Sequence, residues 1–485
     1  MSVEHFDVVI IGAGLSGIGA ACHLQTQCPD RSYVILEGRE ASGGTWDLFR
    51  YPGVRSDSDM YTLGYVFRPW REAKAIADGP SILNYIRETA RAYGVDRQVR
   101  YRHKVLRAAW SSANAAWTVE AEVEGRAVAF TCNFLLTCTG YYDYAGGYTP
   151  EIAGMERFGG RIVHPQAWPE GLDYAGRQVV VIGSGATAVT VVPAMAETAA
   201  HVVMLQRSPT YVVSRPSEDA FANKLRERLP ARLAYHIVRW RNVMLTMVFF
   251  NLARRRPGRV KARLIGWVRD HLGPDYDVET HFTPRYNPWD QRLCLVPDGD
   301  LFRAIRSGKA SVATDTIEGF TEDGIRLSSG RDLKADVVVM ATGLQMQLLG
   351  GVQVSVDGAP VDLSRRLNYK GTMCEGVPNL ASIFGYTNAS WTLKGDLTAG
   401  YVCRLLNYMK RRGYDVCTPR ERDPDIAEQP IIDFSSSYVR RAVDRFPKQG
   451  SRAPWRLRQN YLLDLLGLKF GRVVDGVMQF SRKGA

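Results

Sequence analysis

The sequence has few of the features expected of a redox-cysteine enzyme, a metalloprotein or a secreted protein. Its eight cysteines include no C-x-x-C pair, and no His or Cys residues cluster at metal-ligand spacing. We therefore predict reduced thiols and no metal site. The N-terminal residues contain no basic segment followed by an apolar stretch, so we expect no secretory signal and a cytoplasmic location. With 485 residues and 45% apolar residues, the chain is expected to form two or three globular domains.

The net charge of +12 is concentrated in one segment, residues 224–263, which holds twelve Lys or Arg residues and one acid. The apolar run within it, residues 243–252, is far shorter than the roughly 20 residues that a membrane-spanning helix needs. We predict a helical insert with one buried face and one solvated cationic face; the alternative is peripheral contact with an anionic membrane surface. No aromatic–basic interleaving is present, so we expect no nucleic-acid partner.

Residues 7–38 have the pattern of a strand, a glycine-rich turn, a helix and a second strand. Such a turn brings backbone close to a pyrophosphate, and the helix N-terminus offers free N–H groups to it. Glu37 ends the second strand, where a carboxylate accepts hydrogen bonds from ribose hydroxyls and disfavours a 2′-phosphate. We predict FAD or NAD here, and the N-terminal position favours FAD. The residues assigned to this site are Gly12, Gly14, Leu15, Ser16, Gly17 and Glu37.

Residues 178–208 repeat this pattern with the spacing G-x-G-x-x-A. The residue corresponding to Glu37 is now Arg207, and a guanidinium there can hold a 2′-phosphate with two hydrogen bonds. The second site is therefore predicted to prefer NADPH to NADH. Its assigned residues are Gly183, Ser184, Gly185, Ala186, Thr187, Ala188, Arg207 and Ser208.

Two further motifs carry a family resemblance. Residues 158–169, FGGRIVHPQAWP, have the spacing F-x-G-x-x-x-H-x-x-x-W-P, and residues 43–57 have G-G-x-W-x-x-x-x-Y-P-G-x-x-x-D. Both patterns resemble signatures of the type I Baeyer–Villiger monooxygenases, which are class B flavoprotein monooxygenases, and the resemblance extends over almost the whole chain. It implies an α/β fold with two Rossmann-like dinucleotide-binding domains, one for FAD and one for NADPH, and a helical insertion.

The motifs and the resemblance together predict how the domains divide the chain. We expect an FAD-binding domain at 1–145 and 344–485, an NADPH-binding domain at 146–215 and 291–343, and the helical insertion at 216–290.

The resemblance also implies roles for individual residues. Arg292, which precedes an apolar strand, matches the catalytic arginine beside the nicotinamide, and Asp57 matches the aspartate that orients it; an ion pair between Arg292 and Asp290 is the structural alternative. Gln291 stands where relatives often carry lysine, so Arg207 has more of the 2′-phosphate to bind. His164 is expected to be a hydrogen-bonding element of the interdomain joint. Further cofactor contacts are implied for Gly44, Thr45, Trp46, Asp57, Tyr61, Val105, Thr342 and Gly343, and a cover over the flavin edge for Asn388, Ser390 and Trp391.

The implied reaction uses NADPH and molecular oxygen and proceeds through a C4a-peroxyflavin. As an anion the peroxide adds to a small ketone and gives an ester or lactone, whereas its protonated form oxidises sulfides and thioamides. One alternative is a flavin monooxygenase that mainly oxidises nitrogen or sulfur. A more distant alternative is a non-catalytic flavin sensor on a membrane surface.

Overall fold

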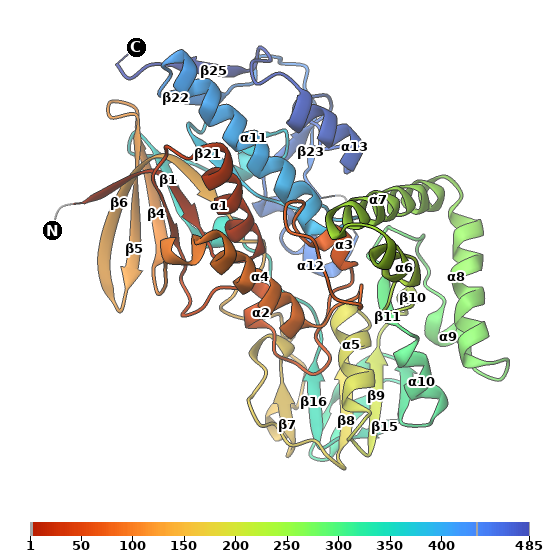
Figure 1. Ribbon diagram of the computed structural model, residues 1–485. Coiled ribbons are helices and arrows are strands. Elements are labelled where there is room, and N and C mark those ends of the chain that lie inside the picture. Colours follow the sequence, from red (N-terminus) through yellow and green to blue (C-terminus); the bar gives the residue numbers. More distant parts are fainter. Residues whose placement is uncertain (1–2, 433–434, 485) are drawn as a thin grey trace.

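Residues 3–432 and 435–484 are described here from a computed structural model of the chain (Figure 1). Two separate sheets, each flanked by helices, confirm the predicted α/β class with two dinucleotide-binding domains. Figure 1 shows the first sheet at the left, the second below it, and a lobe of helices at the right.

The sheet of the first domain has eleven strands, and its central order is β18-β17-β4-β5-β6-β1-β2-β3. β1, β2, β3 and β6 run parallel, as a nucleotide-binding unit requires, whereas β4 and β5 form an antiparallel extension. The strands are β1 (Glu4–Ile11), β2 (Tyr33–Leu36), β3 (Val99–Arg100), β4 (Lys104–Ser111), β5 (Ala116–Val123), β6 (Arg126–Thr137), β17 (Gln353–Val356), β18 (Ala359–Pro360), β19 (Asn368–Tyr369), β20 (Met373–Cys374) and β21 (Leu380–Ser382). The helices are α1 (Leu15–Gln27), α2 (Thr45–Leu48), α3 (Met60–Leu63), α4 (Gly79–Tyr93) and α11 (Trp391–Arg412), with the short turn η1 (Val95–Gln98).

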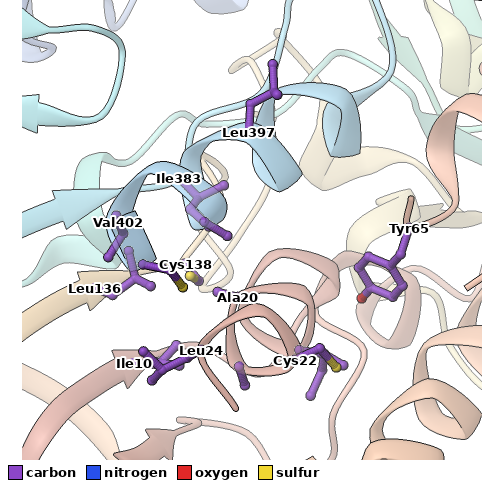
Figure 2. Packing of buried hydrophobic residues seen from close by; sticks show 14 of the residues in the cluster. Ile10, Ala20, Cys22, Leu24, Tyr65, Leu136, Cys138, Ile383, Leu397 and Val402 are labelled. Carbon is purple, nitrogen blue, oxygen red and sulfur yellow. The ribbon is translucent and has the colours of Figure 1, made fainter. Parts of the chain in front are cut away.

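The core of this domain lies between the parallel strands and the two helices α1 and α11. Figure 2 shows Ile10 of β1 and Leu136 of β6 beside Ala20 and Leu24 of α1, together with Val402 of α11. These side chains are almost fully buried, and burial of a large aliphatic side chain contributes about 1.5–3 kcal/mol. The packing therefore fixes the start of α1 against the end of β1, where the glycine turn lies.

The second domain contains a five-stranded parallel sheet in the order β12-β9-β8-β16-β7. A small antiparallel sheet, β13-β14-β15, covers one end; no sequence pattern had indicated it. The elements are β7 (Arg161–Val163), β8 (Gln178–Ile182), α5 (Ala186–Met195), β9 (His201–Gln206), α10 (Asp300–Arg306), β12 (Ala310–Thr314), β13 (Ile317–Thr321), β14 (Gly324–Leu327), β15 (Asp332–Lys334) and β16 (Val337–Met340), with the turns η2 (Met155–Arg157) and η3 (Pro165–Ala167).

The predicted helical insert is present between the two halves of this domain. It contains α6 (Ala220–Arg228), α7 (Ala231–Arg255), α8 (Pro257–Leu272) and α9 (Val278–Phe282). Proline at the first position of α8 separates it from α7, since proline begins a helix readily but cannot continue one. The flanking strands β10 (Val212–Arg215) and β11 (Cys294–Pro297) pair in parallel at the base of the lobe. Within the described residues, no helix has the length and apolar character needed to cross a membrane.

The C-terminal region returns to the first domain and then covers it. Its remaining elements are η4 (Leu348–Gly351), η5 (Leu363–Arg365), β22 (Val416–Pro419), β23 (Glu428–Pro430), α12 (Ser437–Arg440), η6 (Val443–Arg445), β24 (Lys448–Gly450), α13 (Tyr461–Asp464), η7 (Leu465–Phe470) and β25 (Met478–Ser481). The division of the chain into domains at the stated boundaries stays a prediction.

Candidate functional site

The first glycine turn is shaped by close backbone contacts. Gly12 has a φ of +100°, and a Cβ there would lie 2.8 Å from the carbonyl oxygen of Cys138. A Cβ on Gly17 would lie 1.8 Å from the carbonyl oxygen of Gly12, so α1 approaches β1 more closely than any side chain permits. Backbone of Gly44 lies on the other side of Gly14, at 3.4 Å from its ideal Cβ. This backbone-lined cradle beside a helix N-terminus fits a pyrophosphate.

Glu37 lies directly under this cradle and is buried. Its two carboxylate oxygens accept hydrogen bonds from the backbone N–H groups of Ala13, at 2.7 Å, and Arg39, at 2.9 Å. Burial raises the pKa of the Glu37 carboxyl, and the two backbone donors oppose that rise. The backbone N–H of His103 donates to the Glu37 carbonyl at 2.8 Å, which brings the predicted contact residue Val105 on β4 close to the same strand end.

The second glycine turn has the same form in the second domain. Gly183 has a φ of +140°, and its ideal Cβ lies 2.3 Å from the carbonyl oxygen of Ala341. No atom lies within 4 Å of an ideal Cβ on Gly185, so the backbone at the start of α5 is open. The Ser184 hydroxyl donates to the Ser208 carbonyl at 3.1 Å, which ties the turn to the end of β9, where Arg207 is exposed. A guanidinium at this place fits the 2′-phosphate of NADPH.

An inner cavity of about 260 Å³ joins the two glycine turns. Its lining comes mainly from the first turn, the 43–57 loop, residues 138–144 and the start of α5, with Arg292 and Trp391 contributed by other segments. The assigned residues that line it are Gly14, Leu15, Ser16, Gly44, Thr45, Trp46, Asp57, Ala186, Thr187, Arg292 and Trp391. Residues predicted separately for the two cofactors are thus brought to one cavity.

Arg292 and Asp57 form an ion pair on the wall of this cavity, with 3.6 Å between Nε and Oδ2. Arg292 comes from the segment before β11 and Asp57 from the 43–57 loop, so the pair bridges the two domains. The Asp57 carboxylate raises the pKa of Arg292 above its usual range, against the opposing effect of burial. Asp290, the alternative partner, pairs instead with Arg254 at 3.0 Å. Arg292 is therefore a permanent cation facing the cavity.

An outer cavity of about 350 Å³ adjoins the inner one and shares Asp57, Arg292, Leu295 and Tyr386 with it. Its further wall comes from the insert, through Val243, Thr246, Met247 and Phe250 of α7 and Trp267 of α8. In the described part of the chain, two buried polar atoms of this wall have no hydrogen-bond partner: Oδ1 of Asn388 and Nε1 of Trp289. The wall of the outer cavity is mainly apolar, and these two polar atoms are shielded from solvent within it.

The 43–57 loop makes contacts that the sequence motif did not reveal. Tyr51 packs against the core of the second domain, and burial raises its pKa to about 12. A Cβ on Gly53 would lie 2.8 Å from Ala194 Cβ, so the loop approaches α5 closely. Arg55 also forms an ion pair with Asp300 at the start of α10. All three residues lie within the 43–57 motif, so membership of that motif was the sequence signal that could have identified them.

A cluster of tyrosines beside Arg292 was also missed. The hydroxyls of Tyr141 and Tyr142 are 2.7 Å apart, and burial raises the pKa of Tyr141 to about 12. Trp391 stacks on Tyr141 with 5.2 Å between ring centroids, and its Nε1 donates to Ser16 Oγ at 2.7 Å. Trp391 therefore reaches the first glycine turn, at the edge where the cover was predicted. Ser390 contacts Thr62 instead, through a 2.6 Å hydroxyl pair.

The predicted joint lies between the domains. His164 Nδ1 accepts from the Gln166 backbone N–H at 3.1 Å, and burial lowers the pKa of the ring. The ring occupies the place that a Cβ on Gly147 would need. The chain passes from the second domain back to the first at residues 342–343. There the Thr342 hydroxyl donates to the Tyr148 carbonyl at 2.5 Å, and the Tyr148 N–H donates to the Gly343 carbonyl at 3.0 Å. These contacts fit a hinge better than a proton carrier.

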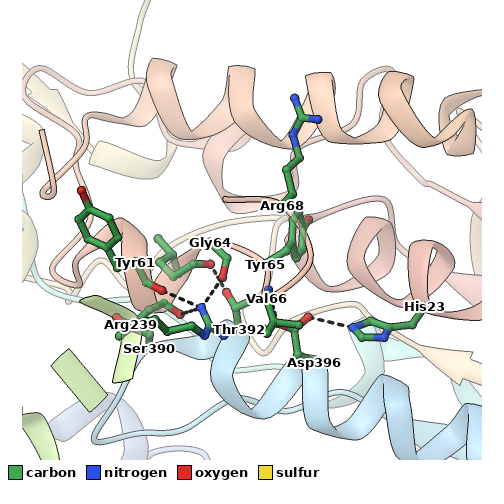
Figure 3. A network of polar contacts seen from close by, with 12 residues as sticks. His23, Tyr61, Gly64, Tyr65, Val66, Arg68, Arg239, Ser390, Thr392 and Asp396 are labelled. Carbon is green, nitrogen blue, oxygen red and sulfur yellow. Dashed lines mark hydrogen bonds and ion pairs between the residues drawn. The ribbon is translucent and has the colours of Figure 1, made fainter. Parts of the chain in front are cut away.

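Thirteen of the assigned residues lie outside the lining of both cavities: nine belong to the two glycine motifs and the strand ends beside them, and the other four are Tyr61, Val105, Thr342 and Gly343. Tyr61 is fully buried under α7, where its backbone carbonyl accepts from Arg239 at 2.7 Å (Figure 3). Arg239 also donates to the Gly64 carbonyl at 2.7 Å and pairs with Asp396 of α11 at 3.5 Å. This buried network fastens α7 to the first domain and so fixes the wall of the outer cavity.

The site combines two glycine turns, an inner cavity that lies between them, and the Arg292 guanidinium on the wall of that cavity. This combination is typical of a flavoprotein monooxygenase that binds two dinucleotides, and comparisons with known proteins agree. Residues 75–253 match the family of flavin-binding monooxygenase-like proteins, and residues 10–73 match the NAD(P)-binding Rossmann-like domain. The chain is 55% identical over 483 residues to the FAD-containing monooxygenase EthA of Mycobacterium tuberculosis, with 99% of each protein covered. It is 53% identical to EthA of Mycolicibacterium smegmatis, over 99% of this chain and 98% of that protein.

The chain therefore belongs to the flavin-binding monooxygenase family, and it uses FAD and NADP as cofactors. Among solved structures, OTEMO in complex with FAD and NADP has the same fold, with a TM-score of 0.75 at 20% identity over 99% of this chain and 100% of that one. Residues 46–64, 205–214 and 287–306, together with the segment from Pro447, resemble the ethionamide-activating monooxygenase, and the identity to EthA confirms that likeness.

Proposed function

We propose that this protein catalyses the NADPH- and O₂-dependent insertion of one oxygen atom next to a ketone carbonyl, giving an ester or lactone. Sulfides and thioamides are further substrates of the same site. The observation that carries the proposal is the Arg292–Asp57 pair, which lies where the inner and outer cavities meet. Reduced FAD supplies the activation of oxygen when it is bound in the inner cavity.

Arg292 determines which oxygen chemistry the site favours. A fixed guanidinium stabilises negative charge that develops on oxygen near the boundary of the two cavities, by an effect of several kcal/mol in a site from which water is excluded. The guanidinium is protonated at every physiological pH, and Asp57 holds it from the side. This electrostatic arrangement supports addition to a carbonyl over transfer of an electrophilic oxygen to sulfur.

The outer cavity is the proposed substrate site. Val243, Met247 and Phe250 give it an apolar wall, so the substrate is expected to carry a hydrocarbon part.

NADPH is proposed to bind along the start of α5, with Arg207 on the 2′-phosphate. The nicotinamide end reaches Thr187, which lines the inner cavity. FAD and NADPH would then both lie in the inner cavity, which Tyr51 and Tyr142 also line.

The test is product analysis under turnover. Purified protein supplied with FAD and NADPH is given a small ketone and an alkyl sulfide in parallel, under isotopically labelled oxygen, and products are identified by mass. Labelled ester from the ketone supports the proposal. A labelled sulfoxide without any ester would favour the nitrogen- or sulfur-oxidising alternative, and the absence of substrate-dependent oxygen uptake would favour the non-catalytic sensor.

The cellular location remains part of the proposal. All eight cysteines are buried and free, as expected for a protein in a reducing compartment such as the cytoplasm.

A further inference from the structure

The outward face of α7 is apolar, although the site needs only its inward face. A stripe of large apolar side chains, here called the α7 stripe, recurs every three or four residues along this face. Its members are 38–60% exposed and comprise Leu233, Ile237, Trp240, Met244, Leu245, Val248 and Leu252. At about 1.5 Å per residue, the stripe extends over about 28 Å. Single exposed apolar residues are normal, but an aligned set of this length marks a contact surface.

The stripe continues onto the C-terminal region. The Trp240 ring meets Tyr461 at the start of α13, with 5.8 Å between centroids. Beyond Tyr461, Leu466 is 59% exposed and Phe470 is 67% exposed on η7. Figure 1 shows α7 and α13 near each other, with the insert forming an outer edge of the molecule away from the β4–β6 sheet. Two chain segments more than 200 residues apart therefore build one apolar surface.

Positive charge surrounds this surface. The segment 224–263 holds twelve Lys or Arg residues and one acid. Arg228 and Arg232 are exposed at one end of the stripe, and Arg255, Arg256 and Arg259 are exposed at the other. An apolar stripe bounded by cations, with a tryptophan among the apolar residues, has the chemistry of a helix that lies in the interface of an anionic lipid bilayer.

We propose that the α7 stripe and its basic ends dock this protein on an anionic membrane surface, with α7 parallel to the bilayer. The opposite face of the same helix lines the outer cavity through Thr246 and Phe250, and Trp267 at the rim of that cavity is itself exposed. Docking thus places a helix that lines the outer cavity directly on the lipid surface. The docking itself does not depend on the proposed reaction.

The charge complementarity distinguishes lipid from a second copy of this chain. A symmetric contact through α7 would bring two sets of unpaired arginines together, which is unfavourable at low salt. An anionic bilayer instead neutralises them.

The test is flotation of the holoenzyme with vesicles made of equal parts phosphatidylglycerol and phosphatidylcholine, compared with phosphatidylcholine alone. We expect binding to the anionic vesicles that weakens as salt rises. The double variant Leu245→Glu/Val248→Glu is expected to reduce binding more than about tenfold, since it places two carboxylates in the apolar contact. Leu106→Glu, at an exposed position on β4, is the matched control and should bind as the parent does.

Two charge-reversal variants test the contribution of the basic ends to membrane binding. Arg255→Glu is expected to weaken binding to the anionic vesicles, whereas Arg331→Glu, at an exposed site in the second domain, should not. FAD content and NADPH oxidation in detergent-free buffer serve as folding controls, because Leu245 and Val248 line neither cavity. Equal binding by parent and double variant would overturn the proposal. So would an absence of vesicle binding together with an oligomer that the double variant dissociates, which would assign the stripe to self-association.

Discussion

The two glycine turns share one backbone design: neither Gly12 nor Gly183 has room for a Cβ, and the turns differ at the later positions of the motif. In the first, Gly17 has no room for a Cβ, because α1 presses on the Gly12 carbonyl. In the second, the matching position is Ala188, which is buried without strain, and Gly185 faces open space. The residue that ends the second strand differs too, since Glu37 is buried and hydrogen-bonded whereas Arg207 is exposed. The strand end of the second site is therefore more open to solvent than that of the first.

Adding one methyl group to each turn is expected to give the largest difference between the two sites, in both stability and flavin content. Gly17→Ala places a Cβ against backbone and is expected to cost more than about 3 kcal/mol and to yield protein without FAD. Gly185→Ala is the matched control, because its Cβ meets nothing within 4 Å; it should retain FAD and fold normally. The measurement is flavin absorbance of the purified proteins with thermal unfolding. Equal flavin content in the two variants would contradict the packing argument.

A second variant tests the difference in charge. Arg207→Ala is expected to raise the KM for NADPH by about 10- to 100-fold, since a charge-assisted bond to phosphate contributes about 1.5–3 kcal/mol, and to leave the KM for NADH unchanged. Arg177→Ala, an exposed arginine elsewhere in the domain, should change neither value. Steady-state kinetics with both nucleotides measure this selectivity. Parallel losses with NADPH and NADH would remove Arg207 from recognition of the 2′-phosphate.

The smallest expected effect concerns the pH dependence of stability. Because the pKa of Glu37 is raised in the folded protein, the folded state binds this proton more tightly than the unfolded state does. Its contribution to stability is thus fully present below the ordinary glutamate pKa and is lost as pH rises through the raised value. Glu37→Gln should flatten this part of the stability profile of the FAD-free protein, as measured by urea unfolding. An unchanged profile would contradict the assignment.

Much of the fold could be predicted from the sequence because its signals are local. Glycine spacing beside apolar strands located both nucleotide units, and helical spacing with excess charge located the insert. The β13–β15 sheet could not be predicted in this way, since its short strands have no repeated pattern. The return of β17 and β21 to the first sheet depends on pairing with β4 and β6, more than 200 residues away.

Part of the candidate site could also be predicted, because some of its residues belong to local sequence motifs. Arg292 and Asp57 were named from their motifs, and the structure brings them to 3.6 Å. The tyrosines beside them and the outer cavity were missed, because they arise only when α7 and α12 fold against the first domain. Tyr438 of α12 illustrates this: it lines one small pocket together with Arg292, although more than 140 residues separate them in the sequence.

The central claim is that Arg292 acts on oxygen transfer rather than on hydride transfer. Arg292→Ala should still be reduced by NADPH under anaerobic conditions, within a few-fold of the parent rate, while ester formation from a ketone falls by at least about a hundredfold. Asp290→Asn, which alters the neighbouring Arg254 pair, is the control and should form ester normally. The most direct measurement is single-turnover reduction followed by product analysis on the same sample. Ester formation by Arg292→Ala at the parent rate would contradict the account.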